Sequence, residues 1–160
     1  TLLAHYIATL RTPVRLDKEE EVRYTPATEV GSRLSKQLLV LMRSSALLNE
    51  REVITPQDIS LAFRVATDCI PEERVKVLTA LLQGKRTTTE VERFTEALGR
   101  LPNKTAQREL KKLEYIGIVQ RVEKNWRIAT QYQEWLKQSG LAEHLINLLP
   151  ILEEQYALSM

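Results

Sequence analysis

Apolar residues recur at intervals of three and four along most of this chain, a pattern typical of amphipathic helices. The segment 71–130 contains three such patterns in succession, and each is closed by a glycine. Two short runs of β-type residues, 118–122 and 126–130, then flank the polar residues 123–125 and predict a hairpin. The sequence therefore predicts a mainly α fold with a small β-hairpin.

Local signals place the ends of the three helices in this segment. Proline is favoured in a first turn, and Thr or Asn caps a helix because its side-chain oxygen accepts a free backbone N–H. Glycine ends a helix because it tolerates the left-handed backbone. The expected boundary residues are Pro71 and Gly84 for the first helix, Thr88 or Thr89 and Gly99 for the second, and Asn103 and Gly117 for the third.

The third helix of this segment has one apolar side and one cationic side. Its spacing places four residues inward, and the polar residues between them must then face outward. The inward residues are Ala106, Leu110, Leu113 and Ile116. Arg and Gln side chains bond base edges, whereas Lys and Thr hold phosphates. The predicted DNA-binding residues are Lys104, Thr105, Gln107, Arg108, Lys111 and Lys112 on the helix, and Arg121, Lys124 and Arg127 on the hairpin.

The segment 71–130 resembles the winged helix-turn-helix domains of many bacterial and archaeal regulators. Their recognition helix typically reads Thr-x-x-Arg-x-Leu-x-x-Leu-Glu-x-x-Gly. The matching residues are Thr105, Arg108, Leu110, Leu113, Glu114 and Gly117. The resemblance implies a fold rather than a target, because winged helices also serve as protein docking modules. In the hairpin, Trp126 is either a core residue or a stacking platform.

The N-terminal part of the chain also predicts helices. Residues 1–10 carry one helical pattern, and an acid-rich turn follows, in which we interpret 18–21 as the solvated start of a helix. A long helix is expected from Thr28 or Glu29 to Leu48. Its broad apolar stripe includes Leu39 and Leu47 at its edges, and predicts contacts on more than one side. The positions expected to face inward are Val30, Leu34, Leu38, Leu41, Met42, Ser45 and Leu48.

A second helix of this region has a strong start signal. Thr55 is the expected cap, Pro56 lies in the first turn, and Asp58 occupies the capping-box position. The positions expected to face inward are Ile59, Ala62, Phe63, Ala66 and Ile70.

The motifs 30–34 (Val-Gly-Ser-Arg-Leu) and 53–59 (Val-Ile-Thr-Pro-Gln-Asp-Ile) resemble the lid subdomain of AAA+ ATPases of the MoxR, helicase-loader and initiator type. In that family the arginine is the sensor-2 residue, which reaches the nucleotide γ-phosphate. The resemblance implies that role for Arg33; an ordinary surface arginine or a local ion pair is the alternative. No phosphate loop and no apolar strand ending in acids occurs in this sequence, so we do not expect it to hydrolyse ATP by itself.

A lid followed by a winged helix is the order found at the C-terminal end of archaeal and eukaryotic replication initiators and of MCM-like helicases. The expected domains are a lid-like subdomain at 1–70, a winged helix at 71–130 and C-terminal helices at 131–160. The segment 141–157 is rich in leucine, and either packs back on the domain or forms a homodimer contact. The chain begins without a methionine, and we expect it to be part of a longer protein.

Composition narrows the chemistry. The formal net charge of +2 does not indicate a nucleic-acid partner, so any basic surface has to be local. Cys69 is the only cysteine, which excludes an intramolecular disulfide, and we expect it to be buried. His5 and His144 have no second ligand at metal spacing, so no metal site is expected. No Ser/His/Asp or Gly-x-Ser-x-Gly signature occurs, so no catalytic residue is expected. No cofactor is expected in this chain, and ATP would be bound by a longer parent protein.

No run reaches the roughly 18 apolar residues that a membrane span needs, and no signal segment is present, so we expect a cytoplasmic location without a membrane partner. The functional hypothesis is a DNA-binding module of an AAA+ replication or helicase-type protein. Its expected partners are DNA and other subunits of an AAA+ assembly. Two alternatives stay open: a protein-protein interaction or assembly domain, and a stand-alone winged-helix transcription regulator.

Overall fold

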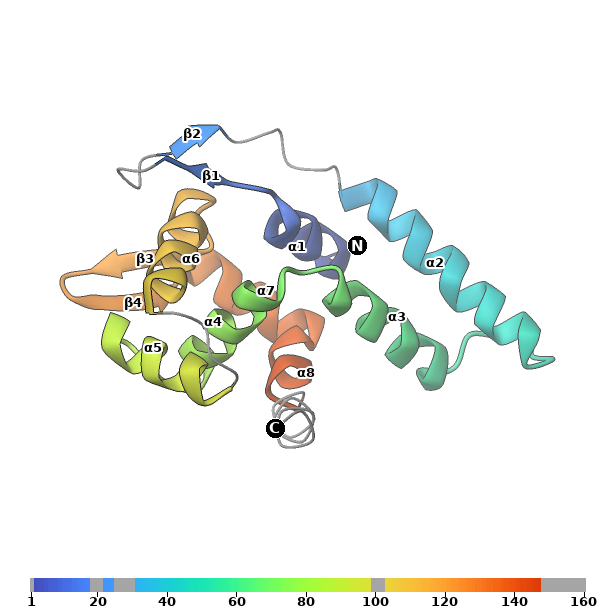
Figure 1. Ribbon diagram of the computed structural model, residues 1–160. Helices are drawn as coiled ribbons and strands as arrows, with labels where there is room; N and C mark the ends of the chain where they lie inside the picture. The colour runs from blue at the N-terminus through green and yellow to red at the C-terminus, as the bar shows by residue number, and fades with distance from the viewer. Residues whose placement is uncertain (1, 18–21, 25–30, 99–102, 148–160) are drawn as a thin grey trace. The chain divides into compact units, whose positions relative to one another are not determined.

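The computed structural model describes residues 2–17, 22–24, 31–98 and 103–147 (Figure 1). The chain forms two compact units. Unit 1 consists of Thr1–Thr12 and Ala27–Pro71, and unit 2 consists of Pro13–Pro26 and Glu72–Met160. The division near residue 71 agrees with the sequence. However, residues 13–26 belong to unit 2 rather than to the expected lid-like domain, and the C-terminal helices are part of unit 2 rather than a separate region.

In the described part of unit 1, three helices pack against one another: α1 (Leu2–Arg11), α2 (Gly31–Leu48) and α3 (Pro56–Asp68). Helices α1 and α2 approach closely at Gly31. A Cβ at this position would lie 2.7 Å from His5 Cα, so only glycine fits without a backbone shift. The expected start of α2 at Thr28 or Glu29, together with Val30, lies outside the described residues.

Asp58 joins α2, the connecting loop and α3. Arg51 donates to both oxygens of its carboxylate, at 2.6 and 2.9 Å, and Ser45 Oγ donates at 2.6 Å. The backbone N–H of Thr55 donates at 2.8 Å, as expected for the capping box. These bonds hold the pKa of Asp58 well below its ordinary value, because they stabilise the charged form. The bond from the Arg51 side chain has the largest effect.

The apolar stripe of α2 is only partly covered. Leu34, Leu38 and Ala46 are buried, but Leu47 and Leu48 are 71% and 85% exposed. The prediction that Leu48 faces inward and that a broad stripe is covered on several sides was therefore wrong within the described chain. Among the described elements, α2 makes its main contacts with α1 and α3, and these contacts leave Leu47 and Leu48 uncovered. On α3, Ile59 is 44% exposed and was also wrongly placed inward.

Unit 2 is built around α4 (Glu72–Leu82), which contacts α5 (Thr88–Ala97), α6 (Asn103–Tyr115), β4 (Asn125–Ile128) and α8 (Leu141–Asn147). The residues of α4 from Arg74 to Leu81 are all buried, including the polar ones, whereas the sequence predicted one buried face. Strand β3 (Val119–Val122) pairs antiparallel with β4, and α7 (Thr130–Ser139) follows. This architecture is mainly α with a small β-hairpin, as predicted.

A second antiparallel pair, β1 (Arg15–Leu16) with β2 (Val22–Tyr24), was not anticipated. The sequence suggested an acid-rich turn and the start of a helix there, and 18–21 lie outside the described residues. Strand β1 contacts α6, so this short pair belongs to unit 2 (Figure 1).

The helix boundaries of unit 2 differ from the prediction in detail. Thr87, rather than Thr88 or Thr89, caps α5, and its hydroxyl accepts from the Glu90 N–H at 3.2 Å. Backbone N–H groups of Thr87 and Arg86 donate to the Glu90 carboxylate, and these bonds lower its pKa from 4.5 to about 2. Pro71 lies just before α4, and Asn103 is the first residue of α6 rather than its cap. The expected stop at Gly99 is outside the described residues.

Gly84 after α4 and Gly117 after α6 have a left-handed backbone at the ends expected from the sequence, and Gly140 after α7 has the same conformation. In the hairpin, the turn is shorter than predicted. Asn125 belongs to β4, and Thr130 begins α7.

The C-terminal helices pack back onto unit 2. Helix α8 contacts both α4 and α7, and Leu136, Leu141 and Leu145 are buried. The packing interpretation therefore holds for the helices up to Asn147, whereas residues 148–157 lie outside the described chain. Cys69, predicted to be buried, is exposed, because α3 ends at Asp68 and Cys69 follows its last turn.

Candidate nucleic-acid interface

Helix α6 is fixed by its apolar side. Ala106, Leu110 and Leu113 are fully buried, as the sequence predicted, and the helix contacts α4, α5 and β3. Gly117 closes it in a left-handed conformation, and the Ile118 N–H bonds the Leu113 carbonyl at 2.9 Å. Contacts on this side set the rotation of the helix, and therefore decide which polar residues reach solvent.

A buried ion pair adds a second constraint on α6. Arg74 Nε of α4 donates to Glu109 Oε2 at 3.2 Å, with the two side chains only 4% and 8% exposed. Lys112 Nζ contacts the other oxygen of the same carboxylate. Sequence reasoning missed this cluster, although Glu109 lies three residues after Ala106 and four before Leu113, which places it near the inward side.

The predicted DNA-binding residues of α6 differ in accessibility. Arg108 is exposed, as expected, and lies on the side opposite the apolar residues. Thr105, Gln107 and Lys111 are half-buried, and Lys112 is half-buried as well as paired with Glu109. The side chain of Lys104 lies outside the described residues. Of the predicted DNA-binding residues on this helix whose side chains are described, Arg108 is therefore fully accessible to solvent and the others are partly accessible.

One exposed residue was not assigned from the sequence. Tyr115, at the end of α6, is 55% exposed. It lies four residues after Lys111 and seven after Arg108, so these three share one side of the helix. The signal that could have found it is this spacing, which the sequence analysis used only for apolar positions.

The hairpin separates its cations instead of gathering them. In the register of β3 and β4, Arg121 faces Trp126 and Gln120 faces Arg127, so Arg121 and Arg127 project from opposite faces. The Arg121 guanidinium lies 5.6 Å from the centre of the Trp126 ring. Lys124 is exposed in the tight turn. Arg127 therefore projects from the face opposite Trp126, and Lys124 projects from the turn between the two strands.

Trp126 is a core residue rather than a stacking platform. It is 3% exposed, and its Nε1–H donates to Thr88 Oγ1 at 3.0 Å. Its backbone N–H donates to the Arg86 carbonyl at 2.7 Å. The tryptophan thus anchors the hairpin to the start of α5.

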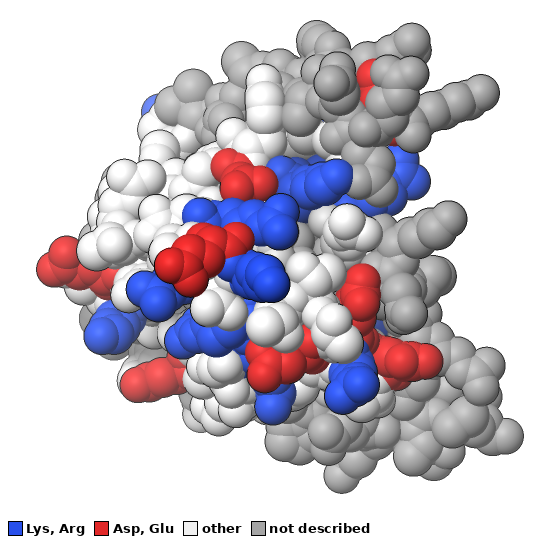
Figure 2. All heavy atoms as spheres, turned by 90° about the vertical axis from the view of Figure 1, so that its left-hand side faces the viewer, with Lys and Arg blue, Asp and Glu red and all other residues white. Residues whose placement is uncertain are grey.

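Figure 2 shows the face that carries the hairpin. Lysine and arginine side chains gather across its middle, and carboxylates lie among them. Glu114 and Glu123 are exposed near the predicted cations. A polyanion would therefore be held by particular side chains at short range and not by a uniform field, since exposed charges are screened beyond about 10 Å at 0.1 M salt.

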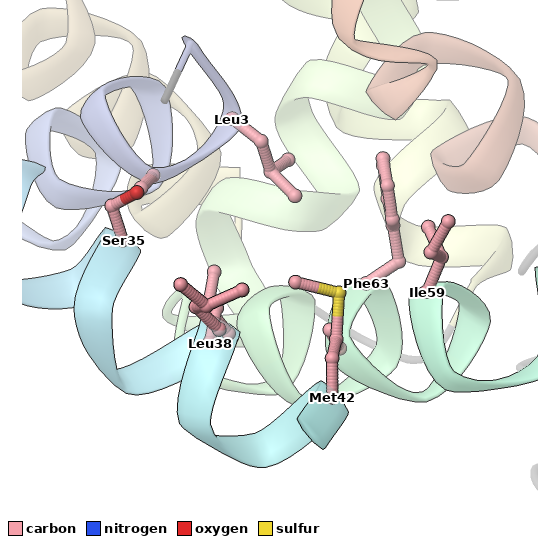
Figure 3. Close-up of a pocket in the computed structure, with 9 residues that line it drawn as sticks. Leu3, Ser35, Leu38, Met42, Ile59 and Phe63 are labelled. Carbon is pink, nitrogen blue, oxygen red and sulfur yellow. The ribbon is translucent and has the colours of Figure 1, made fainter. Parts of the chain in front are cut away.

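In unit 1, Arg33 is exposed in the first turn of α2. The unit also contains an apolar hollow of about 360 Å³. Figure 3 shows Leu3 of α1, Leu38 and Met42 of α2, and Ile59 and Phe63 of α3 around it. Ser35 is the one hydroxyl in its lining. The other residues that line this hollow are apolar.

The described residues contain no group of three or more His, Cys, Asp or Glu side chains that could hold a metal ion. None of the helices in this part of the chain combines the length and the apolar character needed to cross a bilayer. Comparisons with family models, with curated proteins and with solved structures found no match.

Proposed function

We propose that this chain is the DNA-binding module of an AAA+ replication or helicase-type protein, in which unit 2 acts as a winged helix. The observation that carries the proposal is the presentation of α6. Its apolar side is immobilised by α4 and α5, while Arg108 projects into solvent from the opposite side. A helix held in this way offers its cations to a polyanion without paying for their ordering at the moment of binding.

The dimensions of α6 suit this role. Thirteen residues at 1.5 Å each give a helix of about 20 Å, and a helix is about 10–12 Å wide with its side chains, which matches the major groove of B-DNA. Gln107 then meets base edges, whereas Arg108 and Lys111 meet phosphates of the backbone. From the hairpin, Lys124 and Arg127 reach the neighbouring backbone. Arg121, which lies over Trp126, contributes least.

Unit 1 takes the role of the lid in this proposal. Arg33 is exposed at the head of α2, where a planar cation grips a phosphate bidentately. The nucleotide would be ATP held by the remainder of a longer protein.

The test is a fluorescence-anisotropy titration of labelled duplex DNA over a range of salt concentrations. The Arg108→Ala/Lys111→Ala variant removes two phosphate-facing cations, so the slope of log affinity against log salt should fall by about 1.8. The matched control is Lys36→Ala/Arg43→Ala, which removes the same charge from exposed positions of α2. If the first variant binds duplex as tightly as the parent at low salt, the proposed function is wrong.

A second candidate function is a protein assembly domain, and the apolar surface of unit 1 favours it. Val40 and Val53 are 62% and 69% exposed, in addition to Leu47 and Leu48. Exposed apolar patches of this kind mark interaction surfaces in many proteins. Static light scattering alongside the anisotropy titration separates the two functions. Stable self-association without salt-dependent DNA binding would favour assembly.

A further inference from the structure

Strand β1 and helix α6 enclose a polar hollow of about 350 Å³. Arg15 and Leu16 of the strand line it together with the preceding Val14. From the helix it is lined by Thr105, Arg108, Glu109 and Lys112. It could hold a phosphate group with several water molecules, since each water takes roughly 30 Å³. All of these residues belong to unit 2.

The charge around this hollow is positive. Three of its lining residues, Arg15, Arg108 and Lys112, are cations, and Glu109 is the single acid among them. The Glu109 carboxylate is already bonded to Lys112 and to the buried Arg74 behind it. Arg15 and Arg108 are both exposed. Arg15 and Arg108 therefore border the same space, and the carboxylate beside them is already paired.

Strand β1 also limits how α6 meets a duplex. Val14 is buried and Leu16 is half-buried, whereas Arg15 between them is exposed, which is the alternation of a strand with one side packed. The strand occupies the flank of α6 that bears Thr105, Glu109 and Lys112. That flank cannot enter a groove. A DNA strand on this side of the helix must instead pass over the hollow.

We propose that the hollow between β1 and α6 is a phosphodiester-binding site, with Arg15 and Arg108 gripping one phosphate of the DNA backbone. This inference rests on the proposed function, and it adds Arg15, a residue 93 positions away from Arg108 in the chain. Guanidinium groups are suited to this site because their planar donors bond two phosphate oxygens at once. The contact sets the register of the recognition helix and carries no sequence information.

The test uses the full chain and the same labelled duplex. Arg15→Ala removes one phosphate contact, so the salt slope should fall by about 0.9. When salt is raised about fourfold, from about 50 to about 200 mM, both proteins lose affinity for DNA. The factor by which the variant's affinity falls should be about 3.5 times smaller than the factor for the parent, because four raised to the power 0.9 is about 3.5. Arg15→Lys keeps a cation and should keep most of the slope. Arg64→Ala, an exposed arginine of α3, is the matched control and should leave the slope unchanged.

The outcomes separate this inference from the proposed function. Circular dichroism checks that each variant is folded, which we expect because Arg15 is exposed and pairs with Tyr24 through its backbone. If Arg15→Ala keeps the parental slope while Arg108→Ala/Lys111→Ala loses it, the phosphate site is wrong and DNA binding stands. A loss of affinity without a change of slope would also overturn the site. If neither variant changes binding, the proposed function itself is wrong.

Discussion

Removing one partner of the ion pair between Arg74 and Glu109 should strongly destabilise unit 2, and a double-mutant cycle can measure the coupling between the two side chains. Surface ion pairs are worth about 0–1 kcal/mol, but this pair is nearly inaccessible to water, with its side chains 4% and 8% exposed. Glu109→Leu leaves Arg74 buried without this carboxylate. We therefore expect the free energy of unfolding to fall by about 3–5 kcal/mol, the range for breaking a buried pair.

The double variant is the informative one. Arg74→Met/Glu109→Leu replaces both charges by apolar groups of similar length, and such replacements are often neutral or stabilising. Arg74→Met alone should cost less than Glu109→Leu alone, because Lys112 still contacts the Glu109 carboxylate. The double variant should thus be more stable than Glu109→Leu, by about 2 kcal/mol or more.

Urea unfolding followed by tryptophan fluorescence is the appropriate assay. Both tryptophans of the chain, Trp126 and Trp135, lie in unit 2, so the signal reports that unit alone. The slope of the free energy against urea must stay constant across the variants, since a changed slope would mean that a different amount of surface is exposed.

Additive effects would refute the reasoning. If the double variant lost the sum of the two single losses, Arg74 and Glu109 would be acting independently. The reasoning would also fail if Glu109→Leu lowered the free energy of unfolding by less than about 1 kcal/mol, because that is the range for an exposed ion pair and this pair is buried.

Three further predictions concern folding. Gly31→Ala forces a Cβ to within 2.7 Å of His5 Cα, so we expect circular dichroism in denaturant to show unit 1 destabilised by about 1–3 kcal/mol. Glu123 has a φ of 57°, and Glu123→Gly should stabilise unit 2 by about 0.5–1 kcal/mol in the tryptophan assay. The folded-state pKa values of Asp58 and Glu90 lie below their ordinary values. The two ionised carboxylates therefore add fully to the free energy of unfolding above about pH 4.5, and this stabilisation is lost as the pH falls toward 2. Asp58→Asn and Glu90→Gln remove it, so each should reduce the fall of stability with pH on the acid side of a stability-pH curve.

Sequence alone determined the local elements of this protein, because the information for them lies within a few residues. The capping box of Asp58 and the left-handed glycines Gly84 and Gly117 were placed from neighbouring residues, and the structure has them there. The inward residues of α6 followed from helical spacing, since its apolar positions fall on one side. The mainly α fold class followed from the same periodicity.

Tertiary structure decided what depends on contacts between distant segments. Arg74 and Glu109 are 35 residues apart, and neither position indicates by itself that the two side chains meet in the interior. The apolar stripe of α2 predicted coverage, but coverage requires a neighbour, and packing on α1 and α3 leaves Leu47 and Leu48 exposed. Strand β1 lies against α6 only because the chain folds back over it. Periodicity reports which residues share a side of a helix, whereas burial depends on what that side meets.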